Sequence, residues 1–474
     1  MQLTEEPASI DADPSTAVPT PGHWPVDPQE DVPIDPNRIW IDGCFDFAHH
    51  GHAGAMLQAR RLGTALYVGV HSDEEIEHNK GPTVMRLDER IAAVSACRWA
   101  TLAVPNAPYV TQLPWISHYG CEFVVHGDDI TSDAGGEDCY RYVKEAGRFK
   151  IVKRTPGIST TDLVGRMLLC TRTHFIRSLT ARLAGEEGHG SEEERKKVGM
   201  EMTERIGEYA SDESGKEKWV EVWSWSAERS RDRRKSSLSG GSNSTGDSQP
   251  SQRGTHTRMV SGQPPQAGQR VVYVDGGFDL FSSGHIEFLR RVVEAEEGKA
   301  YVVAGVHDDN VINEWKGINY PIMNVFERGL CVLQCKYINA IIFSAPFTPS
   351  KPFLTHLPYG CPSAVYHGPT AFIPLDHDPY AAAKSLGVFR QILAHAFGAV
   401  NAESIVNRIL ESRARYEARQ RAKGEKGAAE EAVRRRESLE NNQAGRERRR
   451  RRESQREEVR RRESLLEVER GFAI

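Results

Sequence analysis

The chain has 474 residues, 27% of them charged, and a formal net charge of -5, so it is long enough for two or three domains that each bury a core. Its start lacks the charged-then-apolar pattern of a signal peptide, and no apolar run approaches the roughly 20 residues of a membrane span. Its 8 cysteines are scattered without a CxxC pair, which favours reduced thiols over a disulfide framework or a zinc site. We therefore expect a cytoplasmic protein with no integral membrane segment.

Residues 1–37 are rich in proline and show little apolar periodicity, which predicts a disordered N-terminal segment. Residues 38–184 have the texture of a globular α/β domain, because short apolar stretches alternate with helical patterns as in a parallel sheet covered by helices. The expected strands are 38–42, 65–71, 122–126 and 149–153, and the expected helices are 52–62, 87–98, 138–147 and 161–172.

Residues 185–268 end in a stretch rich in serine, glycine and arginine that cannot bury enough apolar surface to fold. We expect a mostly disordered linker here. Within it, the alternation over 219–225 indicates one short strand or a docking segment.

Residues 413–474 form an Arg/Glu-rich segment that we expect to be a helical or disordered tail, too poor in leucine, valine and isoleucine to embed in a bilayer. The sequence RRRES occurs there three times, with the arginines placed as basophilic kinases require. The candidate phosphorylation sites are Ser438, Ser454 and Ser464.

Residues 269–412 repeat the pattern of 38–184. The stretch GCFDFAHHGH at 43–52 recurs as GGFDLFSSGH at 276–285, and further echoes follow in the same order at offsets that drift from 233 to 241 residues. The sequence therefore predicts two tandem Rossmann-like α/β domains with parallel sheets, and only the first copy keeps both histidines of the motif.

The first copy has the features of a phosphate-binding turn. A strand ends at Asp42, a glycine-containing turn follows, and a helix is expected to begin near Gly51 or His52. Backbone N–H groups at a helix start favour anions, and His49 and His52 would face one phosphate together and stabilise charge in a transition state. The alternative is a pair of structural turn and helix-cap histidines.

A lysine and an arginine between the motifs are weaker candidates. Lys80 is expected in a loop after the second strand, where a mobile cation could close on phosphates. The alternative is a solvated surface lysine without a specific role, which is the usual case for a lone lysine. Arg90 could serve equally as an ion-pair partner on a helix face.

The stretch RTPGISTTD at 154–162 describes a second anion-receiving helix start, with an arginine to hold charge. Taken alone it is an ordinary N-cap. The chain has no GxxxxGK[ST] and no GxSxG, so neither a P-loop nor a covalent nucleophile is indicated. Cations, imidazoles and backbone N–H groups predict direct in-line transfer at phosphorus.

HHGH at 49–52 followed by RTPGISTTD at 154–162 resembles the HxGH and RTxGxSTT motifs of the cytidylyltransferases, over both globular segments. The tandem arrangement, without an apolar lipid-sensing helix, resembles the member of that family that acts on phosphoethanolamine. The resemblance implies transfer of a cytidylyl group from CTP to phosphoethanolamine, giving CDP-ethanolamine and pyrophosphate in phosphatidylethanolamine synthesis. It also implies Mg²⁺ as the partner of CTP, with no protein metal ligands assigned. No nucleic-acid partner is expected, and the sequence leaves a homo-oligomer open.

The resemblance also implies residue roles. Catalysis at the α-phosphorus falls to His49, His52 and Lys80. CTP binding is implied for Gly43, Phe45, Gly51, Arg154, Gly157, Ile158, Ser159, Thr160 and Thr161. Less specific candidates for contact with the substrates are Asp46, Asp73, Arg90 and Asp128.

The second copy departs from the family at the chemical positions. Ser282 replaces the first histidine, and residues 397–404 lack the arginine and paired threonines of the other motif. We therefore expect a catalytically silent domain that packs on the first. Rival hypotheses are a cytidylyltransferase for another phospho-alcohol such as phosphocholine, a tRNA-charging synthetase, which would need a KMSKS-like loop, and a non-catalytic nucleotide-binding interaction protein. The last predicts that both copies are degraded, and the first is intact.

Overall fold

The computed structural model describes residues 32–129, 131–227, 254–368, 377–419 and 421. Those up to Tyr416 form one compact unit, and the few that follow belong to a second. Most of the expected N-terminal segment and most of the tail, including Ser438, Ser454 and Ser464, therefore lie outside the described residues.

The first repeat (38–184) is built on a five-stranded parallel sheet with the order β3-β2-β1-β4-β5. This is the order of a doubly wound sheet, in which ligands bind at the carboxyl ends of the strands near the central one. Its strands are β1 (Asp35–Gly43), β2 (Ala65–His71), β3 (Leu102–Ala107), β4 (Cys121–Gly127) and β5 (Phe149–Val152).

The helices of the first repeat start close to where the sequence predicts them, with two exceptions. A helix occupies 73–80, so the expected loop position of Lys80 is wrong and Lys80 is the last residue of that helix. A second unexpected helix begins at Leu113. The helices are α1 (His50–Arg60), α2 (Asp73–Lys80), α3 (Leu87–Ser95), α4 (Leu113–His118), α5 (Arg141–Glu145) and α6 (Thr160–Leu169), with a 3-10 turn, η1 (Asp46–Ala48), before α1.

The second repeat (269–412) has the same strand order in β10-β9-β8-β11-β12, extended at the β10 edge by β6 and β7. Because β7 runs antiparallel to β6, this seven-stranded sheet is mixed rather than wholly parallel. Its strands are β6 (Glu221–Ala227), β7 (Gly254–Val260), β8 (Val271–Gly276), β9 (Tyr301–Val306), β10 (Ala340–Phe343), β11 (Ala364–His367) and β12 (Phe389–Gln391). Its helices are α9 (Ser283–Ala295), α10 (Asp309–Lys316), α11 (Val325–Leu333), α12 (Lys351–Thr355), α13 (Ala381–Ser385) and α14 (Ala402–Glu411).

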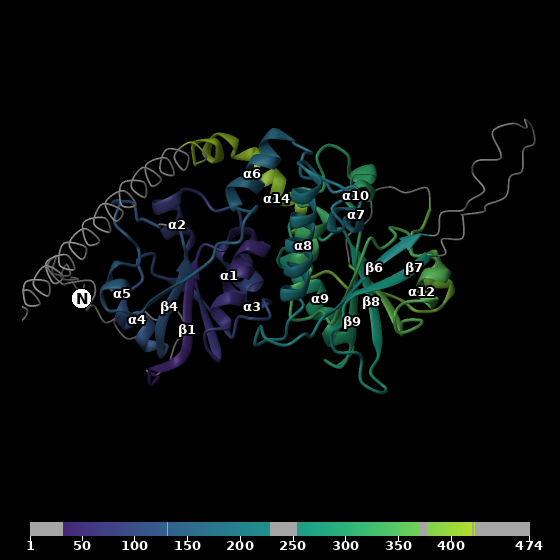
Figure 1. Ribbon diagram of the computed structural model, residues 1–474, viewed down its shortest axis with the longest axis horizontal. Helices are drawn as coiled ribbons and strands as arrows, with labels where there is room; N and C mark the ends of the chain where they lie inside the picture. The colour runs from purple at the N-terminus through teal and green to yellow at the C-terminus, as the bar shows by residue number, and fades with distance from the viewer. Residues whose placement is uncertain (1–31, 130, 228–253, 369–376, 420, 422–474) are drawn as a thin grey trace, which may run out of the picture. The chain divides into compact units, whose positions relative to one another are not determined.

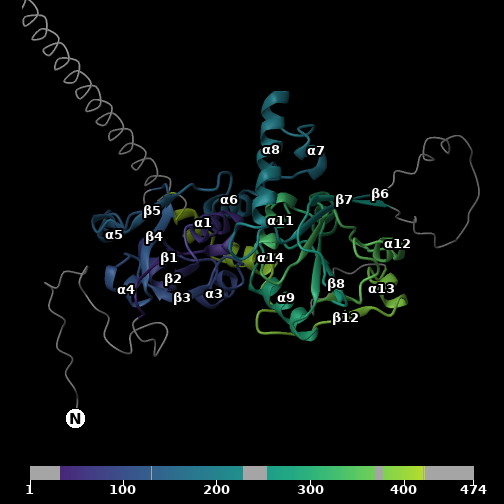
Figure 2. The same ribbon diagram turned by 60° about the horizontal axis from the view of Figure 1, so that its bottom comes forward.

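The segment expected as a mostly disordered linker is ordered over much of its described length. It begins after α7 (Leu179–Leu183) and contains α8 (Glu192–Tyr209) as well as β6 and β7. Helix α8 starts with a capping box, in which the Ser191 side chain accepts from Glu194 N–H while the Glu194 carboxylate accepts from Ser191 N–H. In Figure 1 α8 lies between the two repeats, and Figure 2 shows that one end of α8 projects beyond them together with α7.

Alternating side chains of the central strands divide the interior into three clusters. In β1, Ile39 and Ile41 point into a core that both repeats share, and Trp40 points into a separate cluster on the other face of the first sheet. In β8, Val274 joins the shared core and Tyr273 the outer cluster of the second sheet. The two repeats therefore fold around one continuous apolar interior.

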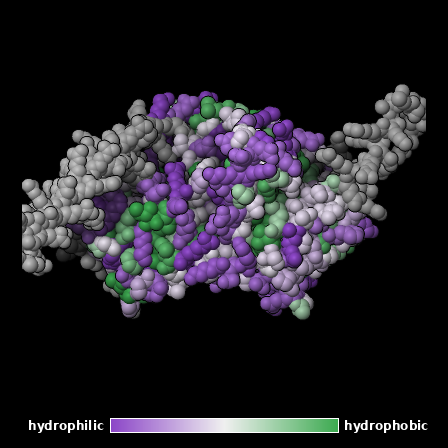
Figure 3. Space-filling model, in the orientation of Figure 1, coloured by the Kyte–Doolittle hydropathy of each residue, from purple (hydrophilic) through white to green (hydrophobic). Residues whose placement is uncertain are grey.

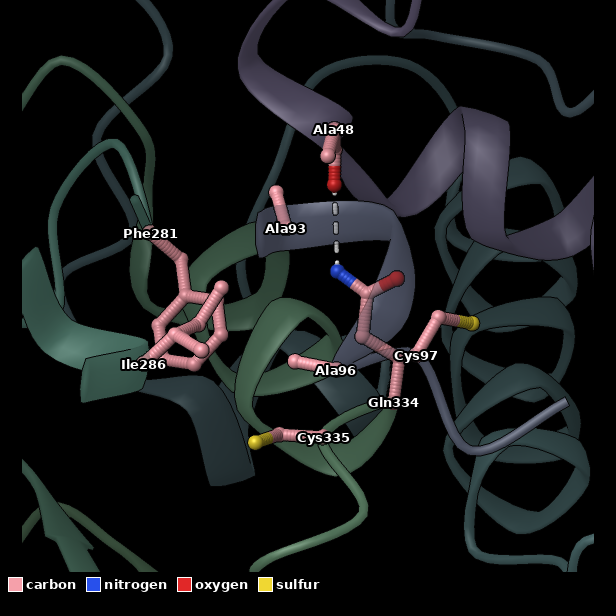
Figure 4. Close-up of a pocket in the computed structure, with 8 residues that line it drawn as sticks. All are labelled: Ala48, Ala93, Ala96, Cys97, Phe281, Ile286, Gln334 and Cys335. Carbon is pink, nitrogen blue, oxygen red and sulfur yellow. Dashed lines mark hydrogen bonds between the residues drawn. The ribbon is translucent and has the colours of Figure 1, made fainter. Parts of the chain in front are cut away.

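The repeats meet about an approximate two-fold axis. Cys97 and Cys335, at equivalent positions, form an isolated antiparallel bridge. Arg98 N–H donates to the Gln334 carbonyl (2.7 Å) and Lys336 N–H donates to the Ala96 carbonyl (2.9 Å), so each bond is the two-fold image of the other. Figure 4 shows the neighbouring Gln334 side chain, whose Nε2 donates to the carbonyl of Ala48 (3.1 Å). Contacts of this reciprocal kind are typical of two-fold dimers.

Two ion pairs obey the same symmetry. Arg166, the seventh residue of α6, pairs with Glu327 through two bonds of 2.7 and 2.9 Å. Arg408, the seventh residue of α14, pairs with Glu89 through two bonds of 2.7 Å. Each repeat thus donates one arginine and one glutamate to the interface.

The surface in Figure 3 is largely hydrophilic, with hydrophobic side chains in separate patches. Within the part of the chain that the structure describes, no helix has both the length and the apolar composition needed to cross a membrane.

Candidate active site

The first motif forms a strained turn after β1. Phe45, Phe47 and Ala48 have left-handed backbone angles (φ 54°, 63° and 41°), which non-glycine residues rarely adopt. Asp46 is buried inside this turn and its carboxylate accepts from the backbone N–H groups of Val84 and Met85. Asp46, a candidate for substrate contact, therefore fixes the turn against the loop that precedes α3.

Two histidines lie stacked at the start of α1. The ring centroids of His49 and His52 are 3.9 Å apart with an interplanar angle of 14°. His49 is the N-cap, and its Nδ1 accepts from Gly51 N–H at 3.1 Å. The rings of Phe45 and His52 meet edge-to-face, with their centroids 5.4 Å apart. The two imidazoles thus lie side by side at a helix start, and their action on a phosphate stays a prediction.

The RTPGISTTD motif packs directly on the first motif. A Cβ on Gly51 would lie 2.7 Å from the Ile158 side chain and 2.9 Å from the His49 ring, so only glycine fits between them. Gly157 has a φ of 81° in the loop, and Ser159 caps α6 by accepting from Asp162 N–H at 3.0 Å. Two helix starts therefore converge on one region.

Thr160 and Thr161 are the first residues of α6, so the N-terminal end of the helix, which favours anions, faces the same region. The loop before them lines a cavity of about 540 Å³. The residues around it are Arg154, Thr155, Pro156, Gly157, Ile158, Ser159 and Asp162.

The loop after β4 holds Arg154 from the other side. Asp128 accepts from Arg154 N–H at 3.2 Å, and the Asp129 carboxylate lies 3.7 Å from Arg154 Nη1. Asp128 therefore joins the ends of β4 and β5. Its role as a contact for the nucleoside or the cationic acceptor stays a prediction.

Lys80 reaches the carboxyl edge of the sheet from the end of α2. Its ammonium lies 5.4 Å from the centre of the Tyr109 ring. Burial is the main cause of a lowered pKa at His126, the residue before the last of β4, and the charge of Lys80 lowers it further. Lys80 and His126 thus share one electrostatic environment at this edge.

Arg90 and Asp73 serve the fold. Arg90 is 1% exposed and donates to three backbone carbonyls, those of Met85, Cys44 and His71. Its remaining nitrogen pairs with Asp73 at 2.6 Å. A guanidinium committed in this way positions the motif loops. Of the two roles expected for Arg90 the ion pair is present, and contact with substrate stays a prediction.

Sequence reasoning missed the residues that reach this turn from outside the first repeat. The Tyr209 hydroxyl, at the end of α8, donates to the carbonyl of His50. Phe326 of the second repeat meets the His50 ring edge-on at 6.4 Å, and Gln334 bonds Ala48. The repeat implied that the two copies would pack, but no periodic signal marked these side chains.

Comparison of the sequence with known proteins agrees with this site geometry. Residues 40–166 match the family described as Cytidylyltransferase-like. The Mus musculus ethanolamine-phosphate cytidylyltransferase is 40% identical over 396 residues, which cover 83% of this chain and 90% of that protein. The Dictyostelium discoideum protein of the same name is 37% identical over 391 residues, covering 82% and 94%. Homo sapiens choline-phosphate cytidylyltransferase A is 41% identical over 153 residues, which cover 31% of this chain and 42% of that protein.

A doubly wound sheet with a histidine pair and a glycine-rich second motif at its carboxyl edge defines a cytidylyltransferase-like enzyme. Matches that extend over both repeats and most of each relative go further. The chain belongs to the ethanolamine-phosphate cytidylyltransferase family.

Proposed function

We propose that this protein transfers a cytidylyl group from CTP to phosphoethanolamine, giving CDP-ethanolamine and pyrophosphate. The observation that carries this proposal is the stacked His49–His52 pair packed on the start of α6, in a chain whose relatives of that name align over both repeats. The choline-phosphate relative aligns over 31% of the chain, which favours phosphoethanolamine over phosphocholine as the acceptor.

In the proposed reaction, a phosphate oxygen of phosphoethanolamine attacks the α-phosphorus of CTP. The new P–O bond forms as the bond to the bridging oxygen of the β-phosphate breaks, and that oxygen leaves with pyrophosphate. The site's task is to position the phosphates and to stabilise charge on the equatorial and leaving oxygens.

The two histidines would donate hydrogen bonds to the oxygens of the α-phosphate, since they lie at the start of α1 where N–H groups also favour an anion. Lys80 would neutralise charge on the reacting phosphates. Arg154 and the N-terminal N–H groups of α6, at Thr160 and Thr161, would hold the leaving pyrophosphate.

We propose that Mg²⁺ enters with CTP. The two carboxylates of the first motif do not fit a metal, because Asp42 accepts from three side chains and Asp46 accepts from two backbone N–H groups. Among the residues that the structure describes, no group of three His, Cys, Asp or Glu side chains converges as a metal site would. Phosphate oxygens and water are the ligands that Mg²⁺ ordinarily takes beside a nucleotide.

The second repeat is proposed to be catalytically silent, and the location of the enzyme is proposed to be cytoplasmic. A homo-oligomer stays a prediction that light scattering of the purified chain would test.

The acceptor is tested by assaying CTP with phosphoethanolamine, phosphocholine and glycerol phosphate in parallel. We expect turnover with phosphoethanolamine to exceed that with the other two. A preference for phosphocholine or glycerol phosphate would contradict the proposed acceptor, and an absence of turnover with all three would contradict the proposed reaction.

A further inference from the structure

A second cavity lies beside the candidate active site and is separate from it. Its volume is about 410 Å³, within the range of small-molecule sites. It is bounded by Pro156 and Gly157, by the segment 173–189, by α8 and by 324–327 of the second repeat. Of the candidate catalytic and CTP-binding residues only Gly157 lines it, so the two sites share one loop and little else.

The cavity has an excess of positive charge. Its charged lining residues are Arg166, Arg177, Arg182 and Arg205 and the glutamates Glu187 and Glu327. The two carboxylates are already used: Glu327 pairs with Arg166, and Glu187 accepts from the N–H groups of Arg177 and Ser178. Among the described residues, neither Arg177 nor Arg205 has a carboxylate partner for its guanidinium.

A buried histidine completes the lining. His50, between the two stacked histidines, is 2% exposed, and neither of its ring nitrogens has a hydrogen-bond partner in the described part of the chain. Burial, followed by the charge of Arg205, lowers the pKa of His50 to about 3, so its imidazole is neutral and the arginines carry the positive charge of the lining. Arg177 is exposed and Arg205 is half-buried, so an anion in the cavity can reach both guanidiniums.

We propose that this cavity binds the phosphate group of a small anionic ligand, at a site distinct from that of CTP. Arg177 and Arg205 would donate charge-assisted bonds to the phosphate oxygens. This inference goes beyond the proposed function, since it concerns a second ligand.

Such a ligand would lie against both active-site motifs, outside the proposed CTP site. His50 lies between His49 and His52 in the turn, and Pro156 and Gly157 precede the N-cap of α6. Because 324–327 and α8 also line the cavity, a bound anion would link the second repeat and the former linker segment to the catalytic loops. The site is therefore suited to regulation of the first repeat.

The test is a calorimetric titration of the full-length protein with inorganic phosphate, in the presence of saturating CTP and the absence of acceptor. CTP occupies the nucleotide site, and the part of the phosphate binding that depends on Arg205, which lines this cavity and not the loop cavity of the active site, reports the proposed site. We expect Arg205→Gln to weaken this binding by about 10-fold or more, the scale of one lost bond to a charged group. A parallel titration with pyrophosphate shows whether free phosphate or the reaction product is the better ligand, and binding of either supports the site.

Lys197→Gln is the matched control, because Lys197 is an exposed cation on the same helix that does not line the cavity. We expect it to bind phosphate as the wild type does. Equal affinities of the Arg205 and Lys197 variants, or no binding to the CTP-saturated wild type, would overturn the proposal. If Arg205→Gln fails to fold, Arg177→Gln carries the same expectation. Failure of CTP itself to bind would instead contradict the proposed function, and the comparison of the variants with phosphate alone would still test the cavity.

Discussion

The turn that follows the first strand keeps two of its three left-handed residues in the second repeat. Phe45 and Phe47 have positive φ angles in the first, and the equivalent Phe278 and Leu280 do in the second. The aspartate between them is buried in both copies and accepts from two consecutive backbone N–H groups. Since the second repeat keeps this strain without the histidine pair, the strained turn belongs to the fold and is not by itself a catalytic device.

A buried arginine is retained with the turn. Arg90 and Arg328 each donate to three backbone carbonyls and to one aspartate, Asp73 or Asp309. An identical network in a repeat that lacks the phosphate motifs indicates that these residues hold the loops in place.

The differences between the repeats lie at the two helix starts. In the second, Ser282 replaces His49, and His285 turns its Nδ1 back to accept from Ser282 N–H at 3.2 Å. Burial, with the charge of Lys316, lowers the pKa of His285 to about 4. The remaining imidazole is therefore a helix cap in place of a phosphate ligand.

The start of α14 likewise keeps the residue that caps the helix and lacks those expected to bind phosphate. Asn401 caps α14 by accepting from Ser404 N–H, as Ser159 caps α6. The positions of Thr160 and Thr161 are taken by Ala402 and by Glu403, whose charge would repel a triphosphate. The cap, which the fold needs, is kept, and the hydroxyl pair is not.

The largest expected effect comes from His52→Ala. Loss of one preorganised donor at the α-phosphate should lower kcat by a factor on the order of 10²–10³. Steady-state assays with CTP and phosphoethanolamine measure this factor. The matched variant His285→Ala should leave kcat unchanged, because that ring caps α9. Equal losses of kcat in two correctly folded variants would contradict the division of roles between the repeats.

The two symmetry-related ion pairs between the repeats can be compared by substituting their glutamates. Glu327→Gln leaves Arg166, whose side chain is 10% exposed, without its partner in the other repeat. Breaking a buried pair costs about 3–5 kcal/mol, and we expect the lower value because Asp162 still contacts Arg166 at 2.7 Å. Denaturant unfolding of the full-length chain measures the free energy of unfolding.

Glu89→Gln is the two-fold image of that substitution and its control. Arg408 is 31% exposed, so water can solvate its guanidinium when the partner is removed. Each glutamate also accepts from the backbone N–H of its own helix cap, at Asn324 or Arg86, so this common loss cancels in the comparison. We expect the smaller destabilisation for Glu89→Gln; the reverse order would show that exposure does not set the strength of these pairs.

How far the sequence predicts the structure differs from element to element. β2 is predicted at its observed bounds of 65–71 because its apolar residues are continuous. β3 is not predicted, because Pro105 interrupts its apolar pattern. The structure tolerates this proline because β3 is an edge strand. α2 is missed because Ile76 is its one buried residue. Such elements depend on contacts that no local pattern encodes.

Some residues of the candidate site are likewise predictable from the sequence, and others are not. Motif spacing identified both helix starts, because the chemistry of phosphate binding needs those residue types together. The role of Arg90 was not predictable, since a buried arginine and one on a helix surface have the same local sequence. The contacts of His50 with Tyr209 and Phe326 depend on packing between segments more than 150 residues apart.

The smallest expected effect concerns the aspartate that ends the first strand. Asp42 accepts from Trp40, Thr111 and Tyr140 in the first repeat. At the equivalent Asp275, Tyr380 donates one bond and Tyr273 is the further donor, so two hydroxyls stand where the first repeat has three donors. Burial raises the pKa of Asp275 to about 7, against the lowering effect of the bonds from Tyr380 and Tyr273.

Because the folded-state pKa of Asp275 is above the unfolded value of about 3.9, the folded protein holds a proton that the unfolded chain releases. The resulting stability is complete below about pH 4 and is lost as the pH rises through about 7. Between pH 6 and 8 the wild type should therefore lose about 1 kcal/mol of unfolding free energy relative to Asp275→Asn, which cannot ionise. Denaturant unfolding of both proteins at the two pH values measures the difference, in which the other titrating groups cancel. A difference that is the same at pH 6 and pH 8 would show that Asp275 ionises normally, and that the second repeat solvates this carboxylate as well as the three donors of the first repeat do.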